Sequence, residues 1–547
     1  MAVAHTNHHL HRQKTRAITR EQQRMAMAPL PAQACSSPSS TTSPLLPSSS
    51  SISSFLASHP ALTLLHTQCA TMAHLRQLHA ALVKSGLAKD PIAASRAVAF
   101  CAGEGRDAAY AARLVRYHRK PNSFMWNTAI RALSDGPGPD AAVALFLDML
   151  RSPTPPERRT FPSLFAAYAR LGRADDGAAL HGMVLKLGLA GDAYTRNSMI
   201  AMYASCGRAD EALALFGQCQ EFDAVACNSA IVALARAGRV DEARAVFDGM
   251  PARTVATWSA MVSAYSRAAR CQDAVDLFSA MQADGVEPNA NVLVSVLGCC
   301  ASLGALEQGA WVHAYIDRRG VAVNALVVTA LVDMYCKCGS IRQARQVFDA
   351  SRSKGFAVLS SWNAMMLGLA VHGQYQEAAA LFSELETYGL RADNVTFIAI
   401  LMAYGHSGMA DEAKALFASM ASEYGVTPGI EHYGCLVDAL ARAGRLREAE
   451  DVIRAMPMKP DAAIWGALLS GCRLHGDAEA GARAAREAVE CDPRDSGAYV
   501  LAASVLARDG EVGTGLGVRG KMREEGVAKV PGCSMIEVNG VVHEFVS

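Results

Sequence analysis

The chain has 547 residues, of which 51% are apolar, and a formal net charge of +1. Its apolar residues are spread at helical spacing, and no run of about 18 of them occurs, which excludes an evident membrane-spanning helix and predicts no membrane partner. The near-zero charge excludes nucleic-acid binding by bulk electrostatic attraction, so any such binding would depend on individually placed side chains.

The first 55 residues differ in composition from the rest of the chain. Their charged residues are one acid, Glu21, and five bases, and a tract rich in Ser, Thr and Pro follows; the bases are Arg12, Lys14, Arg16, Arg20 and Arg24. A basic, Ser-rich and acid-poor leader is typical of an organellar transit peptide. The alternative is an N-terminus that is merely disordered. We therefore expect residues 1–55 to be an organellar transit peptide.

A phrase of the form A-x-x-L/V-F recurs along the chain, and its last residue marks a register. The marker residues lie 31 to 36 residues apart, except for two intervals of 70 that each hide one divergent unit; they are Phe146, Phe216, Phe247, Phe278, Phe348, Phe382, Phe417 and Ile453. A period of this length indicates stacked supersecondary units, because one unit is too short to bury its own apolar face.

Residues 224–254 form the clearest unit. Apolar residues at helical spacing from about 226 to 237 predict a first helix, and Gly238 follows as the residue type that best accepts the positive φ of a helix end. Asp241 opens a second helical stretch, where an acid suits the helix dipole, and Pro251 ends it. The same glycine recurs as Gly207, Gly339, Gly373, Gly408 and Gly444. The sequence therefore predicts an all-α solenoid of stacked helix-turn-helix repeats.

Strand signals are weak until the last residues of the chain. From Met535 to Val546, Asn539 and Gly540 stand between two runs rich in β-forming residues. Asn-Gly between such runs is typical of a tight hairpin turn, so we expect a short C-terminal β-hairpin.

Several phrases carry a resemblance to a known repeat family. They are SFMWNTAI at 123–130, AYTRNSMIAMYASCG at 193–207, ALVVTALVDMYCKCG at 325–339 and SSWNAMM at 360–366. They resemble the plant pentatricopeptide repeats of the P-L-S class, in which three unit types follow in order. A second marker agrees with this, since the L units put His where the others put Phe, at His79, His181 and His313. The resemblance implies a right-handed superhelix.

The resemblance divides the chain into an array over residues 56–461 and a region after it. The array has about 12 units, at 56–90 (L), 91–122 (S), 123–157 (P), 158–192 (L), 193–223 (S), 224–254 (an extra S), 255–289 (P), 290–324 (L), 325–358 (S), 359–393 (P), 394–429 (L) and 430–461 (S). Residues 462–495 and 496–530 resemble the E1 and E2 motifs, and residues 531–547 resemble the tail that completes them. The chain thus resembles the E subgroup, without the DYW deaminase domain.

The resemblance implies a code of one RNA base per unit, read by the fifth residue and the last residue of the unit. The implied pairs are Ser95/Asn122, Asn127/Glu157, Asn197/Asp223, Asn228/Thr254, Ser259/Asn289, Thr329/Val358 and Asn363/Asp393. Asn and Asp can pair with the Watson–Crick edge of a single-stranded base. Local turn or capping chemistry is the alternative for any single Asn, so the argument depends on the recurrence in register.

The implied bases differ from unit to unit. Asn/Asp resembles a uridine reader, in units 193–223 and 359–393, and Ser/Asn an adenosine reader, in units 91–122 and 255–289. Unit 224–254 suggests a pyrimidine. Asn127/Glu157 and Thr329/Val358 depart from the usual pairs and lean weakly to a pyrimidine and a purine. The L units and the unit with Gly434 at its fifth position stay open.

Two further positions of the unit carry recurring residue types, and each recurrence has a functional and a structural explanation. A cation at position thirteen recurs and could contact successive phosphates, or could be a solvated cation favoured by the helix dipole; these cations are Arg170, Arg236, Arg267, Lys337 and Arg442. Position two carries apolar side chains that could stack on bases: Phe124, Tyr194, Val225 and Leu326. For Phe124 and Tyr194 we expect packing between repeats instead.

No catalytic motif is found in the sequence. A zinc cytidine deaminase needs His-x-Glu and Cys-x-x-Cys, and the 15 cysteines include no Cys-x-x-Cys. Cys336 and Cys338 stand two residues apart on an expected helix, where their side chains diverge. We therefore expect no enzyme activity, no metal and no cofactor.

The resemblance implies single-stranded organellar RNA as the partner. It also implies a site-recognition factor for C-to-U RNA editing, which recruits a DYW-type cytidine deaminase in trans, with editing-complex accessory proteins, through the E region. Relatives of this type imply a mitochondrial location, with the chloroplast as the alternative. Two other functions stay open: a factor for organellar RNA splicing, stability or translation, and a tetratricopeptide-like protein-interaction scaffold.

Overall fold

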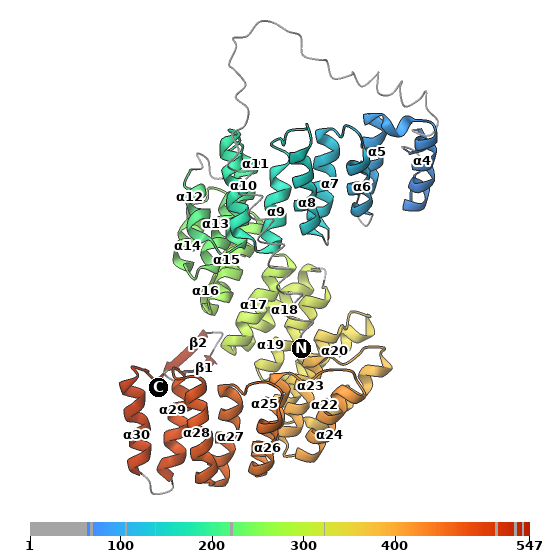
Figure 1. The fold of residues 1–547 in the computed structure, drawn as a ribbon. Helices are drawn as coiled ribbons and strands as arrows, with labels where there is room; N and C mark the ends of the chain where they lie inside the picture. The colour runs from blue at the N-terminus through green and yellow to red at the C-terminus, as the bar shows by residue number, and fades with distance from the viewer. Residues whose placement is uncertain are drawn as a thin grey trace. The chain divides into compact units, whose positions relative to one another are not determined.

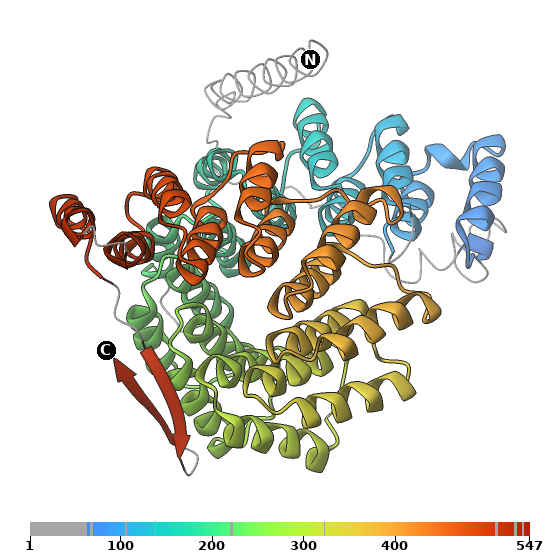
Figure 2. The same ribbon diagram turned by 90° about the horizontal axis from the view of Figure 1, so that it is seen from below.

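The computed structural model describes residues 63–65, 69–103, 107–136, 138–218, 223–321, 323–508, 512–529, 533–538 and 541–546. The expected transit peptide and the turn residues Asn539 and Gly540 lie outside them. Over the described residues the chain forms successive helix pairs followed by one two-stranded sheet (Figures 1 and 2). None of these helices is long and apolar enough to span a bilayer. The helices gather in two compact units, Met1–Ala264 and Tyr265–Ser547.

The first unit is built from helix pairs around one apolar core. Its elements are α4 (Met72–Lys84), η1 (Leu87–Lys89), α5 (Pro91–Cys101), α6 (Ala108–Tyr117), α7 (Ser123–Asp135), α8 (Pro139–Arg151), α9 (Phe161–Leu171), α10 (Ala174–Lys186), α11 (Ala193–Ser205), α12 (Ala209–Phe216), α13 (Ala224–Arg236), α14 (Val240–Asp248) and most of α15 (Val255–Arg267). The marker residues Phe146 and Phe247 are both buried, as the repeat pattern predicts.

The second unit continues the same pairing. Its elements are α16 (Cys271–Ala283), α17 (Ala290–Leu303), α18 (Leu306–Arg319), α19 (Ala325–Lys337), α20 (Ile341–Ser353), α21 (Leu359–Val371), α22 (Tyr375–Thr387), α23 (Asn394–His406), α24 (Ala410–Ser422), α25 (Ile430–Arg442), α26 (Leu446–Ala455), α27 (Ala462–His475), α28 (Ala478–Cys491), α29 (Ser496–Arg508), α30 (Val512–Glu524), β1 (Cys533–Val538) and β2 (Val541–Val546). The two strands pair antiparallel, so the expected hairpin is confirmed (Figure 2).

The turn inside six of the pairs is the one that the sequence predicts. Gly238 has φ of 75°, a left-handed conformation that a side chain would strain, and it lies between α13 and α14. Its Gly equivalents in the other units also have positive φ. The predicted helix from about 226 to 237 begins two residues earlier, at Ala224, because the side chain of Asp223 caps it.

The region after the array is stacked like another repeat. First helices pack on first helices, α23 on α25 and α25 on α27. A Cβ added to Gly471 of α27 would lie 2.5 Å from the Cβ of Ala441, so the two helices approach as closely as their backbones allow. One apolar cluster runs from Phe397 to Val505. The E-like region is therefore continuous with the repeats of the second unit.

The hairpin also contacts a distant helix of the second unit. The carboxylate of Glu537 in β1 accepts hydrogen bonds from the backbone N–H groups of Glu307, at 2.8 Å, and Gln308, at 3.3 Å. Both N–H groups lie in the first turn of α18, where they have no partner within the helix. The contact joins residues some 230 positions apart in the sequence.

Candidate nucleic-acid interface

The last residue of most units is the N-cap of the next unit's first helix; Glu157 is an exception, because Thr160 is the N-cap of α9. In eight places the side-chain oxygen of the last residue accepts a hydrogen bond from a backbone N–H of the first turn: Asp90, Asn122, Asp192, Asp223, Asn289, Asn324, Asp393 and Asp461. Ser, Thr, Asn and Asp are favoured here because they satisfy an N–H that the helix leaves unpaired. Capping therefore explains part of the recurrence, and it leaves further polar atoms of each side chain to be placed.

In three units the structure brings the fifth and last residues into contact. The Asn122 amide Nδ2 donates to Ser95 Oγ at 3.2 Å, and the Asn363 amide Nδ2 donates to Asp393 Oδ1 at 3.0 Å. The Asn197 amide donates to Asp223 in the same way. Within each compact unit, we call these positions at the starts of the first helices the reading edge.

The other pairs are arranged differently. Asn127 Oδ1 accepts from the hydroxyl of Thr160 at 2.7 Å. Asn228 Oδ1 is buried without a partner among the described residues, while the hydroxyl of Thr254 faces that of Thr257 at 3.1 Å. Two pairs remain.

In units 255–289 and 325–358, each member of the pair has its own surroundings. Thr329 donates to the carbonyl of Ala325 at 2.8 Å, and its partner Val358 is apolar. Ser259 lies in the first compact unit and Asn289, which caps α17, in the second. Contact between the fifth and last residues is thus observed in three units, and Asn127, Asn228 and Thr329 have other surroundings.

Asp393 is held as a carboxylate. Burial by itself would raise its pKa, but hydrogen bonds from the backbone N–H and hydroxyl of Thr396 and from the amide of Asn363 outweigh burial and lower the pKa. An ionised carboxylate only accepts hydrogen bonds. Asp393 therefore presents an acceptor at neutral pH, which suits a base edge that carries an N–H.

A groove lies beside Asn127 on the reading edge. It is lined by Phe124, Asn127, Arg131, Glu157, Arg158, Arg159 and Tyr194, among others. Phe124 is 53% exposed and Tyr194 is 70% exposed, so the expectation that they pack between repeats is wrong. Position two points away from the neighbouring helices, as the exposure of Val225 and Leu326 also indicates. Exposed rings beside an amide and cations form a set that can stack on bases.

Position thirteen lies at the opposite ends of the first helices. The Arg236 guanidinium donates to the carbonyls of Ala204, at 3.4 Å, and Ser205, at 2.7 Å, which close the preceding first helix. Arg170 does the same for the carbonyls of Ser134 and Gly136. Within each compact unit, we call these positions, at the ends of the first helices and the starts of the second helices, the closing edge.

The other cations of the register behave differently. Lys337 pairs with Asp333 at 2.9 Å and Arg442 with Asp438 at 2.7 Å, each on its own helix. Arg267 is exposed. The sequence reasoning missed three histidines that stand at this position or the next and hydrogen-bond to a carbonyl of the preceding first helix: His372, His406 and His475. Their shared register was the signal that could have found them.

Ion pairs join successive second helices along the closing edge. Arg445 contacts Glu448 at 2.6 Å on its own helix and Asp411 at 2.5 Å on the preceding second helix. Arg208 and Arg239 repeat the pattern in the first unit. The hydrogen bonds from Arg445 and Lys414 lower the pKa of Glu448 to about 2.

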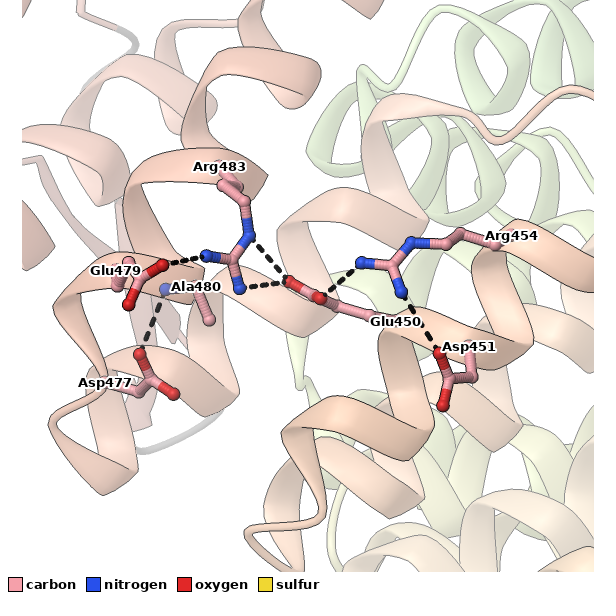
Figure 3. A network of polar contacts seen from close by, with 7 residues as sticks. All are labelled: Glu450, Asp451, Arg454, Asp477, Glu479, Ala480 and Arg483. Atoms are coloured by element: carbon pink, nitrogen blue, oxygen red, sulfur yellow. Dashed lines mark hydrogen bonds and ion pairs between the residues drawn. The ribbon is translucent and has the colours of Figure 1, made fainter.

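One carboxylate of this kind is buried, at the junction of the last repeat and the E-like region. Glu450 of α26 accepts from Arg454 at 2.7 Å and from Arg483 of α28 at 2.9 Å (Figure 3). Its side chain is 10% exposed, whereas that of Arg483 is 43% exposed. A buried carboxylate needs such partners, so this pair fixes α28 against α26.

The cysteines are placed as structural residues. Burial raises the pKa of the Cys336 thiol to about 12, which keeps it protonated. Cys338 points to the carbonyl of Cys300, at 3.7 Å. No group of three or more His, Cys, Asp or Glu that could hold a metal is found in the part of the chain that the structure describes.

Comparison with known proteins identifies the family of the chain. A protein of Arabidopsis thaliana named as a chloroplastic pentatricopeptide repeat-containing protein is 49% identical over 511 residues, which cover 93% of this chain and 90% of the relative. The chain belongs to the pentatricopeptide repeat family. The PPR repeat model matches residues 194–223, 225–255, 256–286, 327–356, 360–390, 395–424 and 431–459, and the E motif model matches residues 475–537. The resemblance inferred from the sequence is confirmed.

Other pentatricopeptide repeat proteins are similar over most of this chain. A second from Arabidopsis thaliana is 43% identical over 482 residues, covering 88% of this chain and 77% of the relative. Another, named chloroplastic/mitochondrial, is 36% identical over 530 residues, covering 92% and 76%. The crystal structure of a maize pentatricopeptide repeat protein aligns with 94% of this chain and 88% of its own, at 19% identity and a TM-score of 0.47.

Proposed function

We propose that this pentatricopeptide repeat protein is a sequence-specific single-stranded RNA-binding factor of plant organelles. The observation that carries the proposal is the contact between the fifth and last residues in three units, Ser95 with Asn122, Asn197 with Asp223 and Asn363 with Asp393. Such contacts place donors and acceptors side by side at the same point of three units, 91–122, 193–223 and 359–393. One pair per unit matches one base per repeat.

The proposed readers are the pairs expected from the sequence, and the proposed bases are uridine for units 193–223 and 359–393 and adenosine for units 91–122 and 255–289. Those cations of position thirteen that do not bind carbonyls would add phosphate contacts. Arg170 and Arg236 would first have to release the carbonyls that they now bind. Lys337, Arg442 and Arg267 would not have to release a carbonyl.

For the role of the bound RNA, we propose site recognition in C-to-U editing. The support is the E motif match at residues 475–537, on a region that stacks on the last repeat without a break. The region would recruit a DYW-type deaminase and accessory proteins in trans. A factor for RNA splicing, stability or translation would bind RNA in the same way and is the second candidate.

The location within the cell is part of the proposal. The acid-poor leader over residues 1–55 suits either organelle, and relatives are named chloroplastic or chloroplastic/mitochondrial. The mitochondrial assignment expected from the sequence competes with the chloroplast, and a fluorescent fusion of the full chain separates the two. A protein-interaction scaffold stays a third candidate, which the absence of RNA affinity would favour.

Organellar RNA sequencing in a loss-of-function line tests the proposed function. Editing predicts that one or a few cytidines stay unconverted. Each should lie just 3′ of a sequence with U, A and U in the order of units 193–223, 255–289 and 359–393. Unchanged editing together with an altered intron or transcript end would instead establish the second candidate.

A further inference from the structure

A third residue takes part in the contact between Asn363 and Asp393. The hydroxyl of Thr396, the third residue of the following unit, shares its one proton between Asn363 Oδ1 at 2.8 Å and Asp393 Oδ1 at 2.9 Å, while the Asn363 amide Nδ2 donates to Asp393 Oδ1 at 3.0 Å. Thr396 is fully buried and Asn363 is 5% exposed. Both ends of the Asn363 amide therefore have a partner, and rotating the amide by half a turn would set its oxygen against a carboxylate.

The same arrangement recurs in the first unit. Thr160, again the third residue of an L unit, donates to Asn127 Oδ1 at 2.7 Å and accepts from the backbone N–H of Glu157 at 3.0 Å. In both places the threonine lies between the last residue of the unit and the amide of its fifth residue. Two of the three junctions of a P unit with an L unit have this threonine. The third has Val292 in its place, and there the fifth residue of the P unit is Ser259, which has no side-chain amide to orient.

A natural contrast exists in the chain. Asn197 and Asp223 are the same pair of residue types as Asn363 and Asp393, but Ala226 stands where Thr396 would be. Asn197 Oδ1 is buried and has no partner among the described residues. The Asn197 amide is thus held at one end only.

The difference between the two asparagines matters because a side-chain amide can present two opposite patterns of hydrogen-bond donors and acceptors. Rotation by half a turn exchanges its N–H donors and its carbonyl acceptor. Uridine and cytidine differ by the same kind of exchange on the Watson–Crick edge, since uridine carries N3–H and O4 where cytidine carries N3 and the N4 amine. A fixed amide retains one free N–H and one lone pair in a defined order, so it distinguishes the two pyrimidines better than a mobile one.

We propose that Thr160 and Thr396 are positioning residues, which orient the amides of Asn127 and Asn363 and so sharpen base selection by units 123–157 and 359–393. The inference rests on the proposed RNA-binding function and adds one residue from the following L unit to the two readers of each of these units. Thr396 acts through Asn363 and need not touch the base.

Selection from a randomised single-stranded RNA library, bound to the full chain, tests the proposal. The unchanged protein should enrich uridine at two positions, one facing unit 193–223 and one facing unit 359–393. Thr396→Val should lower the ratio of uridine to cytidine at the second position by about fivefold, the effect of one ordinary hydrogen bond, and leave the first unchanged. Thr396→Ser, which keeps the hydroxyl, should restore the ratio.

Thr195→Val is the matched control. Thr195 is also buried and also bonds an N-cap aspartate, Asp192, through both its N–H and its hydroxyl, but the fifth residue of the preceding unit is Pro162, which has no amide. It should lose a comparable amount of stability without changing either ratio. An unchanged ratio in Thr396→Val, or an equal loss in Thr195→Val, overturns the proposal. Failure of the unchanged protein to enrich any base overturns the proposed reading function itself.

Discussion

The reading edge and the closing edge belong to the same helices and differ in how their polar atoms are used. On the closing edge, Arg236 and His475 bind carbonyls of the preceding helix. On the reading edge, acceptors are left over: Asn197 Oδ1 and Asn228 Oδ1 are buried with no partner in the described part of the chain. Both edges repeat in register, so recurrence alone does not distinguish a binding surface from an architectural one. The hydrogen-bond partners are what differs between the two edges.

The unpaired atoms have an energetic meaning. Leaving a buried acceptor unpaired costs about 1 to 3 kcal/mol, and most native structures avoid it. Asn228 Oδ1 and Asn197 Oδ1 have no partner in the described part of the chain, and they lie at the same point of two successive units, among the residues proposed above as base readers.

The largest effect is expected away from the reading edge, at the buried Glu450. Arg483→Ala should lower the stability of the E-like region by about 2 kcal/mol, because it leaves a buried carboxylate with one of its two partners. Hydrogen exchange of residues 462–508 measures the loss. Base selection should not change. Arg486→Ala, at an exposed position of the same helix, is the control, and an equal effect there would contradict this role of the pair.

The next effect is on base choice at the reading edge. Asp393→Asn should shift the preference of unit 359–393 from uridine to cytidine by about tenfold, because an amide can donate to cytidine N3 where the carboxylate accepts from uridine N3–H. Asn caps a helix about as well as Asp, so the fold should persist. Competition binding between RNAs that differ only at that base measures the shift.

Asp192→Asn provides the control for this substitution. Asp192 caps α11 in the same way, but it follows a unit whose fifth residue is Pro162. We expect equal stability and no change of base preference. If both variants alter the preference alike, the effect belongs to the cap and the distinction between the two edges is lost.

Substitution of the cations at position thirteen should have a smaller effect on RNA affinity, and the effect should differ between two groups of these cations. Lys337→Gln and Arg442→Gln should each lower the slope of log affinity against log salt by about 0.7, the value for one phosphate contact on a single strand. Arg236→Gln should leave the slope unchanged and lower stability by about 1 kcal/mol, because its hydrogen bonds go to carbonyls. An equal slope for all three variants would place them in one class and contradict the division.

Much of the fold follows from the sequence. The period, the positive φ of Gly238 and the terminal hairpin all depend on local chemistry that a few residues determine. The pairing of Asn363 with Asp393 followed from the family resemblance, since the two residues are 30 positions apart.

The partners across repeats could not be predicted in this way. Arg236 meets Ser205, and Thr396 meets Asn363, only because of how far one unit is displaced along the next. Periodicity gives the length of a repeat and not this displacement. The exposure of Phe124 and Tyr194 has the same origin, since an apolar residue in the first turn faces the neighbour or the solvent according to the stacking.

The smallest effect concerns two carboxylates whose pKa values are lowered for different reasons. Neutral donors lower the pKa of Asp393 against the effect of burial, and hydrogen bonds from two cations lower that of Glu448 to about 2. A lowered pKa stabilises the fold above the ordinary carboxyl pKa, and that stability is lost as the pH falls through the folded value. Salt screens an exposed ion pair and acts little on bonds to neutral groups. Acid titrations followed by circular dichroism, between about pH 4.5 and pH 2, measure the effect. High salt should reduce the stability difference between the unchanged protein and Glu448→Gln. It should leave the stability difference between the unchanged protein and Asp393→Asn as it is. Equal salt sensitivity of the two differences would mean that both edges are held by charge.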